Sequence, residues 1–383
     1  VNVDNRAVGG VEQYLDANKL VDPVYGAQPS TRPPLALSLD ISVQHALEKE
    51  LADAVTTYRA RGAGGVVLDV ETGEVIASAS LPRVDPAHPQ LSSRPEEIDR
   101  MTAGTYELGS IFKMMTIAMG LESGVVTPES VLDVSQPLKS GRFEIKDHHG
   151  GAAKLSVRDV FIKSSNVGAG QLALQAGAER QRAFLTSLGL TERARTETGY
   201  LAAPMLPRTW GEIETITIGY GHGLAVAPLQ FAAAAAALIN GGEYVVPTFL
   251  KRPAGAEIER RRVVSEATSA AMRDMMRANV EERGGTGRRA QVEGYAVGGK
   301  TGTAEIAVRG RYDHNAVIAS FLGAFPIDKP RYVTLVMVFR PSRTSASAGE
   351  ITAGHTAAPV TRKIISRIAP LLGVAPRQST AGG

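Results

Sequence analysis

Runs of β-forming residues stand near both ends of this chain, and a mainly helical stretch lies between them. Residues 62–80, GAGGVVLDVETGEVIASAS, contain two runs joined around Thr72-Gly73, which predicts a β-hairpin. Three more runs follow residue 290, namely GYAVGGKTGTAEIAV, AVIASFLGAF and RYVTLVMVF. Since both ends must share one hydrophobic core, we expect an α/β fold of the α+β type. In it, one mostly antiparallel central sheet is flanked by helices and joined to a helical subdomain.

The composition of the chain also predicts where its domain begins and ends. Residues 1–34 end in the proline-rich stretch AQPSTRPP and are expected to be the remnant of a preceding N-terminal module with its linker. One domain is expected over residues 35–372, followed by a C-terminal tail at 373–383.

The sequence predicts regular secondary structure at both ends of this domain. LALSLD at 35–40 alternates like a strand, and a last amphipathic helix is expected from Ala357 to about Leu372. A helix capped by Ser42 is expected to bury one apolar face made of Val43, Leu47, Leu51, Ala54 and Tyr58.

The overall composition excludes several kinds of chemistry. The chain of 383 residues is 43% hydrophobic and contains no cysteine, which excludes disulfides, zinc sites built on thiolates and a cysteine nucleophile. A formal net charge of +3 is small for this length and gives no support for a nucleic-acid partner. The apolar run FAAAAAALINGG is shorter than the ~18 residues that a transmembrane helix needs, and it predicts a buried helix. If the natural protein is anchored in a membrane, its anchor is therefore expected upstream of this chain.

The stretch YELGSIFKMMTIAMGLESG places Ser110 three residues before Lys113 at the start of a predicted helix. This spacing puts both side chains on one helical face, within reach of each other. A serine hydroxyl is a weak nucleophile until a nearby base takes its proton, and a lysine can be that base only if its pKa falls from about 10.4. Such a pair is more often exposed on a helix surface, but Lys113 sits in an apolar stretch and is the only lysine with a serine three residues before it.

A second motif lies in VFIKSSNVGAGQLAL, which supplies Ser164, Ser165 and Asn166. A hydroxyl and a carboxamide presented two residues apart on a turn can pass a proton and hold a substrate amide. The alternative is a structural role, in which the motif caps the helix that is expected to follow.

The stretch GYAVGGKTGTAE from Gly294 fits two patterns. It matches G-x-x-x-x-G-K-[ST], the phosphate-binding loop of nucleotide hydrolases, and it also contains Lys-Thr-Gly. A phosphate loop needs a strand before it and a helix starting at Lys300, whereas here the preceding residues are loop-like and strand-forming residues follow. We therefore expect a strand on which Lys300 brings positive charge and Thr301 and Thr303 face one side. Gly302 is expected to let a substrate approach the backbone closely.

The three motifs occur in the order Ser-x-x-Lys, Ser-x-Asn, Lys-Thr-Gly, a set shared by class A β-lactamases and penicillin-binding proteins. Longer stretches agree with it: YELGSIFKMMT, KSSNVG, GYGHGLAVAPLQ, GGKTGTAE and FLGAFPIDKPRYVTLVMVFRP. Over residues 36–372 the sequence resembles the transpeptidase domain of class B penicillin-binding proteins, above all the division-specific septal D,D-transpeptidases. The resemblance implies a β-lactamase/transpeptidase-like fold. Leu108 stands where this family often has proline, at a position that touches no catalytic group.

The resemblance also implies roles for the residues of the first two motifs. Ser110 would be the acylated nucleophile and Lys113 its base. Ser164 and Asn166 would assist proton movement and position the substrate, and Ser165 would contribute to substrate binding.

For the third motif, the resemblance implies a role in charge stabilisation and carboxylate binding. Lys300 would support the electrostatics as a catalytic residue, while Thr301 and Thr303, next to Gly302, would hold the carboxylate of the substrate. The backbone N–H groups of Ser110 and Thr303 would form the oxyanion hole.

The implied function is the cross-linking of peptidoglycan stem peptides through a serine acyl-enzyme during septal cell-wall synthesis, with β-lactams as inhibitors. The implied partners are stem peptides ending in D-Ala-D-Ala, β-lactam antibiotics, and divisome membrane proteins including a glycosyltransferase. No nucleic acid, cofactor or metal is implied, and His148-His149 is expected to be a solvated turn. The implied location is the periplasmic face of the inner membrane at the division site. An elongation-specific class B transpeptidase, a serine β-lactamase or penicillin-sensor domain, and a scaffold without enzymatic activity remain alternatives.

Overall fold

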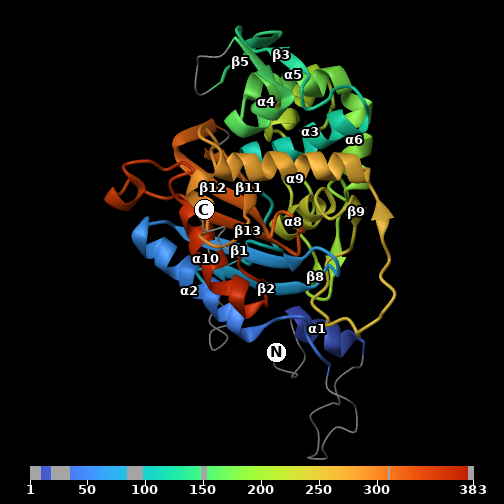
Figure 1. The fold of residues 1–383 in the computed structure, drawn as a ribbon, viewed down its shortest axis with the longest axis vertical. Coiled ribbons are helices and arrows are strands. Elements are labelled where there is room, and N and C mark those ends of the chain that lie inside the picture. Colours follow the sequence, from blue (N-terminus) through green and yellow to red (C-terminus); the bar gives the residue numbers. More distant parts are fainter. Residues whose placement is uncertain (1–9, 19–34, 84–97, 148–152, 309–310, 378–383) are drawn as a thin grey trace, which may run out of the picture.

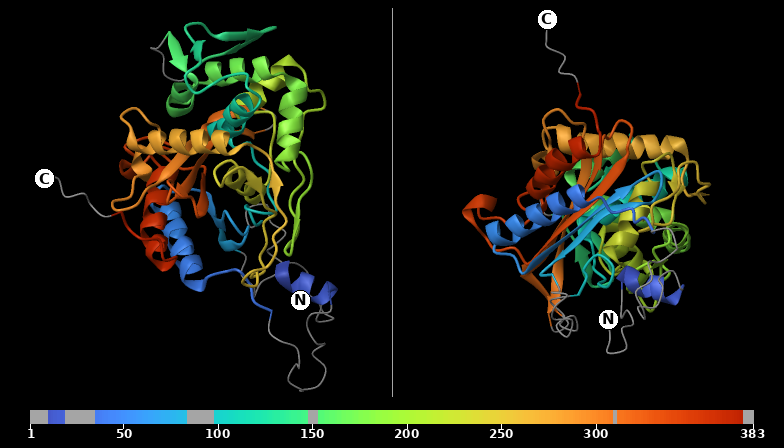
Figure 2. Two further views of the ribbon diagram at one scale, coloured as in Figure 1. Left: turned by 45° about the vertical axis from the view of Figure 1, so that its right-hand side comes forward. Right: turned by 90° about the horizontal axis from the view of Figure 1, so that it is seen from below.

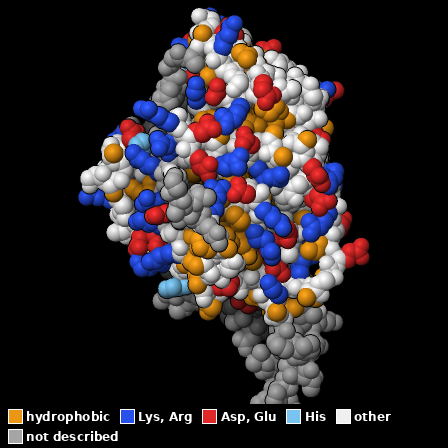
Figure 3. Space-filling model, in the orientation of Figure 1, with side chains coloured by type: hydrophobic (Ala, Val, Ile, Leu, Met, Phe, Trp, Pro, Cys, Tyr) orange, Lys and Arg blue, Asp and Glu red, His pale blue; other side chains and the backbone are white. Residues whose placement is uncertain are grey.

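The computed structural model describes residues 10–18, 35–83, 98–147, 153–308 and 311–377. Figure 1 shows a central sheet with a mostly helical region above it and the short helix α1 (Gly10–Ala17) near the lower end. On the face seen in Figure 3, Lys and Arg side chains are interspersed with Asp and Glu, and hydrophobic side chains lie between them.

A five-stranded antiparallel sheet forms the centre of the molecule, and its strands come from both ends of the described chain. They are β1 (Gly62–Asp69), β2 (Val75–Leu81), β11 (Gly298–Val308), β12 (Arg311–Phe325) and β13 (Tyr332–Phe339). The strand order is β11-β12-β13-β1-β2, so the N-terminal hairpin joins the C-terminal strands where β1 pairs with β13. The predicted hairpin is confirmed, and Gly73 at its turn has the positive φ (+70°) that favours glycine. One antiparallel sheet shared by both ends is therefore confirmed.

Helices cover both faces of this sheet, because successive side chains of each strand point to opposite sides. On one face α2 (Ile41–Thr57) and α10 (Ala357–Leu371) pack together, and Val67 of β1 belongs to the core beneath them. On the other face α8 (Pro228–Ala237) packs against β1 and β13, and Val66 belongs to that core. Figure 2 shows α2 and α10 side by side along the sheet.

The second core continues into the helical region, whose predicted mainly helical character is confirmed. Its helices are α3 (Lys113–Glu122), α4 (Val157–Lys163), α5 (Asn166–Ala176), α6 (Ala178–Ser187) and α7 (Glu212–Tyr220). Helix α9 (Glu266–Glu281) lies between this region and the sheet in Figure 1, and it packs against α3, α4 and β11. It thereby connects the two halves of the molecule.

Short strand pairs and 3-10 helices lie between the larger elements. The pairs are β3 (Val131–Asp133) with β6 (Lys154–Ser156), β4 (Leu138–Ser140) with β5 (Phe143–Ile145), β7 (Arg195–Thr196) with β8 (Gly199–Tyr200), and β9 (Glu243–Tyr244) with β10 (Arg261–Arg262). The 3-10 helices are η2 (Gly109–Phe112), η3 (Arg288–Ala290) and η4 (Ser345–Ser347).

Two details near residue 40 differ from the sequence-based expectations. The N-cap of α2 is Asp40, because its Oδ1 accepts hydrogen bonds from the N–H groups of Ser42 (2.8 Å) and Val43 (3.0 Å), so the prediction of Ser42 as the cap was wrong. LALSLD forms a single bridge, Leu37 with Leu250, in place of a regular strand. The apolar face predicted for α2 is buried, as expected, at Val43, Leu47, Leu51, Ala54 and Tyr58.

The predicted boundaries at residues 34 and 372 stay predictions. Of the expected terminal segments only residues 10–18 and 373–377 are described. Within them, Val11 of α1 packs against the core, and Arg377 forms ion pairs with Asp328 (2.6 Å) and Glu281 (3.3 Å).

Candidate active site

The first motif lies where a 3-10 turn runs into a helix. Ser110 belongs to η2, and Lys113 is the first residue of α3. Lys113 is fully buried, Ser110 is half-buried, and Lys113 Nζ lies 3.0 Å from Ser110 Oγ. Gly109 has a φ of +57°, and a Cβ there would come within 2.7 Å of the carbonyl oxygen of Thr303. Glycine therefore allows the turn that carries the serine to pack directly against β11.

Lys113 Nζ has four oxygen neighbours. It lies 2.6 Å from Ser164 O, 2.7 Å from Asn166 Oδ1 and 3.1 Å from Ser164 Oγ, in addition to Ser110 Oγ. The carbonyl oxygens of Ser164 and Asn166 can only accept hydrogen bonds. A neutral amine has two N–H groups and one lone pair, so two donations to these carbonyls leave the lone pair facing the hydroxyls. A base is thus held against a nucleophile.

The surroundings favour this neutral form of the amine. Burial lowers the pKa of Lys113 well below its ordinary value of 10.5, because a charged ammonium loses its hydration there. The positive charge of Lys300 lowers this pKa further, while the carboxylate of Asp147 raises it. Burial also lowers the pKa of Lys300 to about 7. Burial and the charge of Lys300 therefore both favour the neutral amine beside Ser110.

Ser164 links the two lysines. It ends α4 in the left-handed conformation, with a φ of +62° that is uncommon for a residue other than glycine. Its carbonyl contacts Lys113, and its hydroxyl lies 3.1 Å from Lys113 Nζ and 2.9 Å from Lys300 Nζ. A hydroxyl can donate and accept at once, so Ser164 can relay a proton between the two amines.

Ser165 lies differently from its neighbours in the motif. It is buried, and its hydroxyl accepts from the N–H of Gly168 (2.9 Å) as the N-cap of α5 and donates to Asp147 Oδ2 (2.7 Å). The helix-capping alternative therefore describes Ser165 itself, whereas Asn166 reaches Lys113. The expectation that Ser165 binds substrate finds no support in this geometry.

Asp147 is a residue of the site that the sequence did not reveal. Its Oδ1 accepts from the N–H groups of Asn166 (2.5 Å) and Val167 (3.0 Å), while Oδ2 accepts from Ser165. Asp147 thus fixes the turn that directs Asn166 toward Lys113. The only signal in the sequence is a lone aspartate in IKDHHGG, which has no fixed spacing to the turn that it holds.

The third motif lies on β11, the strand at one edge of the described sheet. Lys300 is fully buried, donates to Ser164 Oγ, and its Nζ lies 5.7 Å from the centre of the Phe161 ring. A strand continues through Thr301 and beyond, so this stretch is not a nucleotide-binding loop that opens a helix. Thr301 Oγ1 donates to Thr286 Oγ1 (2.7 Å), and Thr303 Oγ1 accepts from the N–H of Ala353 (3.1 Å).

Gly302 allows a close contact within the protein. A Cβ at this position would lie 2.5 Å from Leu108 O and 2.7 Å from Ser320 Oγ. The close approach that glycine allows is therefore that of the segment before Ser110, which packs on β11. The sequence-based expectation that glycine here lets a substrate approach the backbone closely stays a prediction.

A second loop supports the turn that carries the serine. The carboxylate of Glu107 accepts from the N–H of Gly223 (2.8 Å) and lies 3.2 Å from His222 Nδ1. The N–H of Gly109 donates to Gly221 O (3.1 Å), so the loop GYGHG packs on the backbone next to Ser110. The contacts of His222 thus fit a structural role at the edge of the site.

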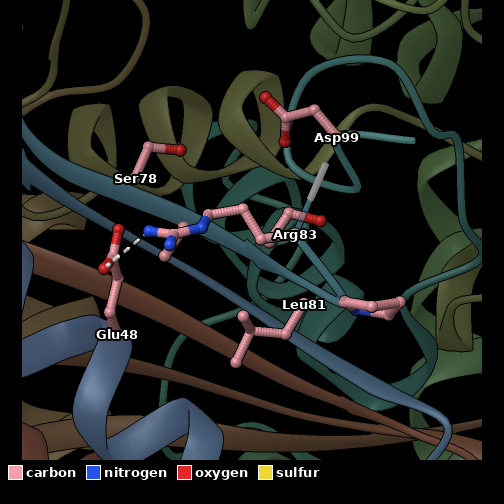
Figure 4. Close-up of a pocket in the computed structure, with 8 residues that line it drawn as sticks. Glu48, Ser78, Leu81, Arg83 and Asp99 are labelled. Atoms are coloured by element: carbon pink, nitrogen blue, oxygen red, sulfur yellow. Dashed lines mark ion pairs between the residues drawn. The ribbon is translucent and has the colours of Figure 1, made fainter. Parts of the chain in front are cut away.

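A hollow of about 240 Å³ lies at the opposite edge of the sheet, along β2. Figure 4 shows its lining, where the guanidinium of Arg83 reaches toward Glu48, 3.5 Å away, near Ser78 and Asp99. It contains none of the residues of the three motifs. Its lining offers an exposed ion pair but no nucleophile beside a base.

The described part of the chain offers neither a membrane-spanning helix nor a metal site. It contains no helix that is both long and apolar enough to cross a bilayer, and no group of three His, Asp or Glu side chains that could hold a metal. His148-His149 lies outside the described residues.

A family comparison agrees with the arrangement of the three motifs. Residues 63–366 match the model of the penicillin binding protein transpeptidase domain. The chain therefore belongs to the family of penicillin-binding protein transpeptidase domains.

Individual relatives and a solved structure point in the same direction. The chain is 41% identical over 98% of its length to the probable peptidoglycan D,D-transpeptidase FtsI of Caulobacter vibrioides (strain NA1000 / CB15N), and it spans 64% of that relative. It is 30% identical to the peptidoglycan D,D-transpeptidase FtsI of Escherichia coli (strain K12), with 100% of this chain and 66% of that relative covered. The apo transpeptidase domain of penicillin-binding protein 3 from Burkholderia pseudomallei superposes with a TM-score of 0.80 at 31% identity, covering 92% of this chain and 100% of that one.

Proposed function

We propose that this chain is the catalytic part of a class B penicillin-binding protein and acts as a serine D,D-transpeptidase on peptidoglycan stem peptides. One observation carries the proposal: the buried Lys113 amine lies 3.0 Å from Ser110 Oγ while two carbonyl oxygens occupy its possible N–H donors. Both FtsI relatives are named as peptidoglycan D,D-transpeptidases, which supports the substrate class.

The first half-reaction acylates the serine. Ser110 Oγ attacks the carbonyl carbon between the two terminal D-alanines and gives its proton to Lys113 Nζ. In the tetrahedral intermediate, the backbone N–H groups of Ser110 and Thr303 stabilise the oxyanion, a contribution of about 3 kcal/mol per donor. The proton then passes through the Ser164 hydroxyl to the leaving nitrogen, the C–N bond breaks, and D-alanine departs. An ester on Ser110 remains.

The second half-reaction transfers the acyl group. An amine of a neighbouring stem peptide attacks the ester carbonyl, loses a proton to Lys113, and forms the new amide as Ser110 Oγ leaves and regains its proton. The edge position of β11 supports this peptide chemistry, because an edge strand presents N–H and C=O groups that an extended peptide can pair with.

Intact mass after incubation with a β-lactam tests this proposal. A β-lactam carries a strained amide that Ser110 can open, so we expect a persistent one-to-one adduct on the native chain and none on Ser110→Ala. Ser123→Ala, an exposed serine at the end of α3, is the matched control and should form the adduct. No adduct on the native chain, or an adduct that survives Ser110→Ala, would contradict the proposal. Rapid release of the opened drug would indicate a β-lactamase.

We further infer that the full-length protein works in septal synthesis at the periplasmic face of the inner membrane, together with a glycosyltransferase of the division machinery. The likeness to the two FtsI relatives supports this inference over an elongation role. A fluorescent fusion of the full-length protein should gather at the division site. A signal spread along the lateral wall would favour the elongation-specific enzyme.

A further inference from the structure

The segment that leads into the nucleophile runs beside the loop that follows α7. Two backbone hydrogen bonds of 3.1 Å join Tyr106 to Val226 of that loop in an antiparallel bridge. A third backbone bond runs from the N–H of Gly109 to Gly221 O, also at 3.1 Å. The 221–226 loop therefore contacts the serine turn along its length.

One peptide group of the serine turn lies against the start of this loop. Gly221 has a φ of +104°, and a Cβ added to it would overlap Gly109 O. Gly109 O and the N–H of Ser110 belong to the same planar peptide group, so a contact that holds the carbonyl also sets the direction of the N–H. That N–H is one of the two donors proposed for the oxyanion.

A side chain of the serine turn holds the loop in place. Glu107 Oε1 accepts from the N–H of Gly223 (2.8 Å), and Oε2 lies 3.2 Å from His222 Nδ1. A carboxylate can only accept, so Nδ1 carries the hydrogen of the second contact. The side chains of Glu107 and His222 are only 22% and 25% exposed, and water weakens their contact correspondingly little. One carboxylate thus joins both residues that follow Gly221.

The sequence of the loop explains why a side-chain clamp is needed there. Gly221 and Gly223 both have positive φ, +104° and +81°, and glycine moves easily between backbone conformations. Backbone hydrogen bonds hold the loop on either side of Gly223, at His222 by the last turn of α7 and at Val226 by the serine segment. The carboxylate of Glu107 fixes the glycine between these two points.

We infer that Glu107 and His222 are positioning residues of the oxyanion hole: they hold the 221–226 loop so that Gly221 keeps the N–H of Ser110 aimed at the reacting carbonyl. Neither side chain touches the reacting atoms in this assignment, because both act through the backbone of the serine turn. The inference rests on the proposed function. It gives the contacts of His222 a role in the reaction beyond support of the fold.

The test compares acylation by a β-lactam with acylation by its thioxo analogue, in which sulfur replaces the carbonyl oxygen of the four-membered ring. Sulfur is a weak hydrogen-bond acceptor, so the ratio of the two rates measures how well the oxyanion donors are aimed. Damage to Ser110 or Lys113 would lower both rates together. Removing an oxyanion donor costs about 10²–10³-fold, so a misdirected donor in Glu107→Ala should lower the oxygen rate and the ratio about tenfold.

Conservative variants separate positioning from support of the fold. Glu107→Gln keeps a carbonyl for the N–H of Gly223, and His222→Asn places an amide N–H near the position of Nδ1, so both should keep the ratio within about twofold of native. His222→Leu fills the space without a donor and should lower the ratio about fivefold. Glu179→Ala, which removes an exposed glutamate of α6, is the matched control and should keep both native rates.

The outcomes separate the inference from the function beneath it. Equal losses with both compounds in Glu107→Ala, an unchanged ratio, or a Glu107→Gln variant as impaired as Glu107→Ala would overturn the inference alone. Where urea unfolding shows that Glu107→Ala does not fold, His222→Leu decides by the same ratio. No acylation of the native chain, or acylation that survives Ser110→Ala, would overturn the proposed function and the inference with it.

Discussion

The two edge strands of the central sheet, β2 and β11, have different neighbours. Along β2, Gln44 of α2 accepts from the N–H of Ser78 (2.9 Å) and donates to its carbonyl (2.8 Å), and the N–H of Asp40 donates to Ile76 O (2.9 Å). Side-chain and cap groups thus take the place of a neighbouring strand. Along β11, the helical region instead brings Ser110 and Lys113 to the edge. The α2 contacts thus close the β2 edge, whereas the proposed function uses the β11 edge to bind an extended peptide.

The charged side chains at the two edges also differ in their exposure to water. At the β2 edge, Arg83 and Glu48 form an ion pair whose side chains are 70% and 33% exposed, so water screens it. At the β11 edge, Lys113 and Lys300 are fully buried and lose that hydration. The hollow of about 240 Å³ lies along β2, whereas the two lysines with lowered pKa values, Lys113 and Lys300, lie at the β11 edge. The shifted pKa values, more than the hollow, indicate where a proton is moved.

Removal of the base should produce the largest effect. Lys113→Met keeps an apolar side chain of similar length in a buried place but cannot take the proton of Ser110, so acylation by a β-lactam should slow by about 10²–10⁴-fold. Adduct formation followed by intact mass measures the rate. Lys163→Met, an exposed lysine next to the motif, is the matched control and should acylate normally. A near-native acylation rate in Lys113→Met would show that Lys113 is not the base and that the β11 edge does not owe its chemistry to this lysine.

Loss of the second lysine should have a smaller effect at the same edge. Lys300→Met removes the donor to Ser164 Oγ and the positive charge that favours neutral Lys113, so acylation at neutral pH should slow by about 10–100-fold. Stopped-flow kinetics with a chromogenic β-lactam measures this. An unchanged rate would show that Lys300 is only a structural element of β11.

At the β2 edge, a substitution should lower the free energy of unfolding without changing the acylation rate. Gln44→Met removes both hydrogen bonds to Ser78, and the backbone groups left behind should cost about 1–3 kcal/mol in the free energy of unfolding. Urea unfolding measures this loss, and Lys49→Ala on the exposed side of α2 is the control. Acylation should stay within about twofold of the native rate, since Ser78 lies across the sheet from Ser110. A large loss of acylation without a loss of stability would contradict the comparison.

The smallest effect is expected in the hollow itself. Arg83→Ala breaks the exposed pair with Glu48, which should change the free energy of unfolding by at most about 0.5 kcal/mol. Acylation should not change. A marked loss of acylation would show that the hollow of Figure 4 takes part in the reaction.

The sequence predicted those parts of the comparison that depend on local spacing. Helical geometry alone places Lys113 beside Ser110, and strand alternation places Thr301 and Thr303 on one side. The β-rich runs at both ends predicted a shared antiparallel sheet. The first two inferences held because each depends on residues only a few positions apart, and the third held because the β-rich runs at both ends share one hydrophobic core.

Features that depend on long-range pairing could not be predicted. Which strands form the edges follows from the pairing of β1 with β13, which no local pattern encodes. Asp147 and Asn279 each hold a motif from a distant segment, through contacts without a fixed spacing. The sequence also could not tell which residues of the second motif face Lys113. Ser165 caps α5, whereas its neighbour Asn166 contacts Lys113.

The pH dependence of Ser110 acylation tests most directly whether a neutral Lys113 is the base. The rate should rise with pH through a pKa well below 10.5 and then level off, because burial and the charge of Lys300 disfavour the ammonium. In Lys300→Met, loss of that charge raises the pKa of Lys113, so the acid limb should move to higher pH. A native rate that keeps rising to pH 10 and beyond, as for an ordinary lysine, or an acid limb that Lys300→Met leaves in place, would contradict this assignment.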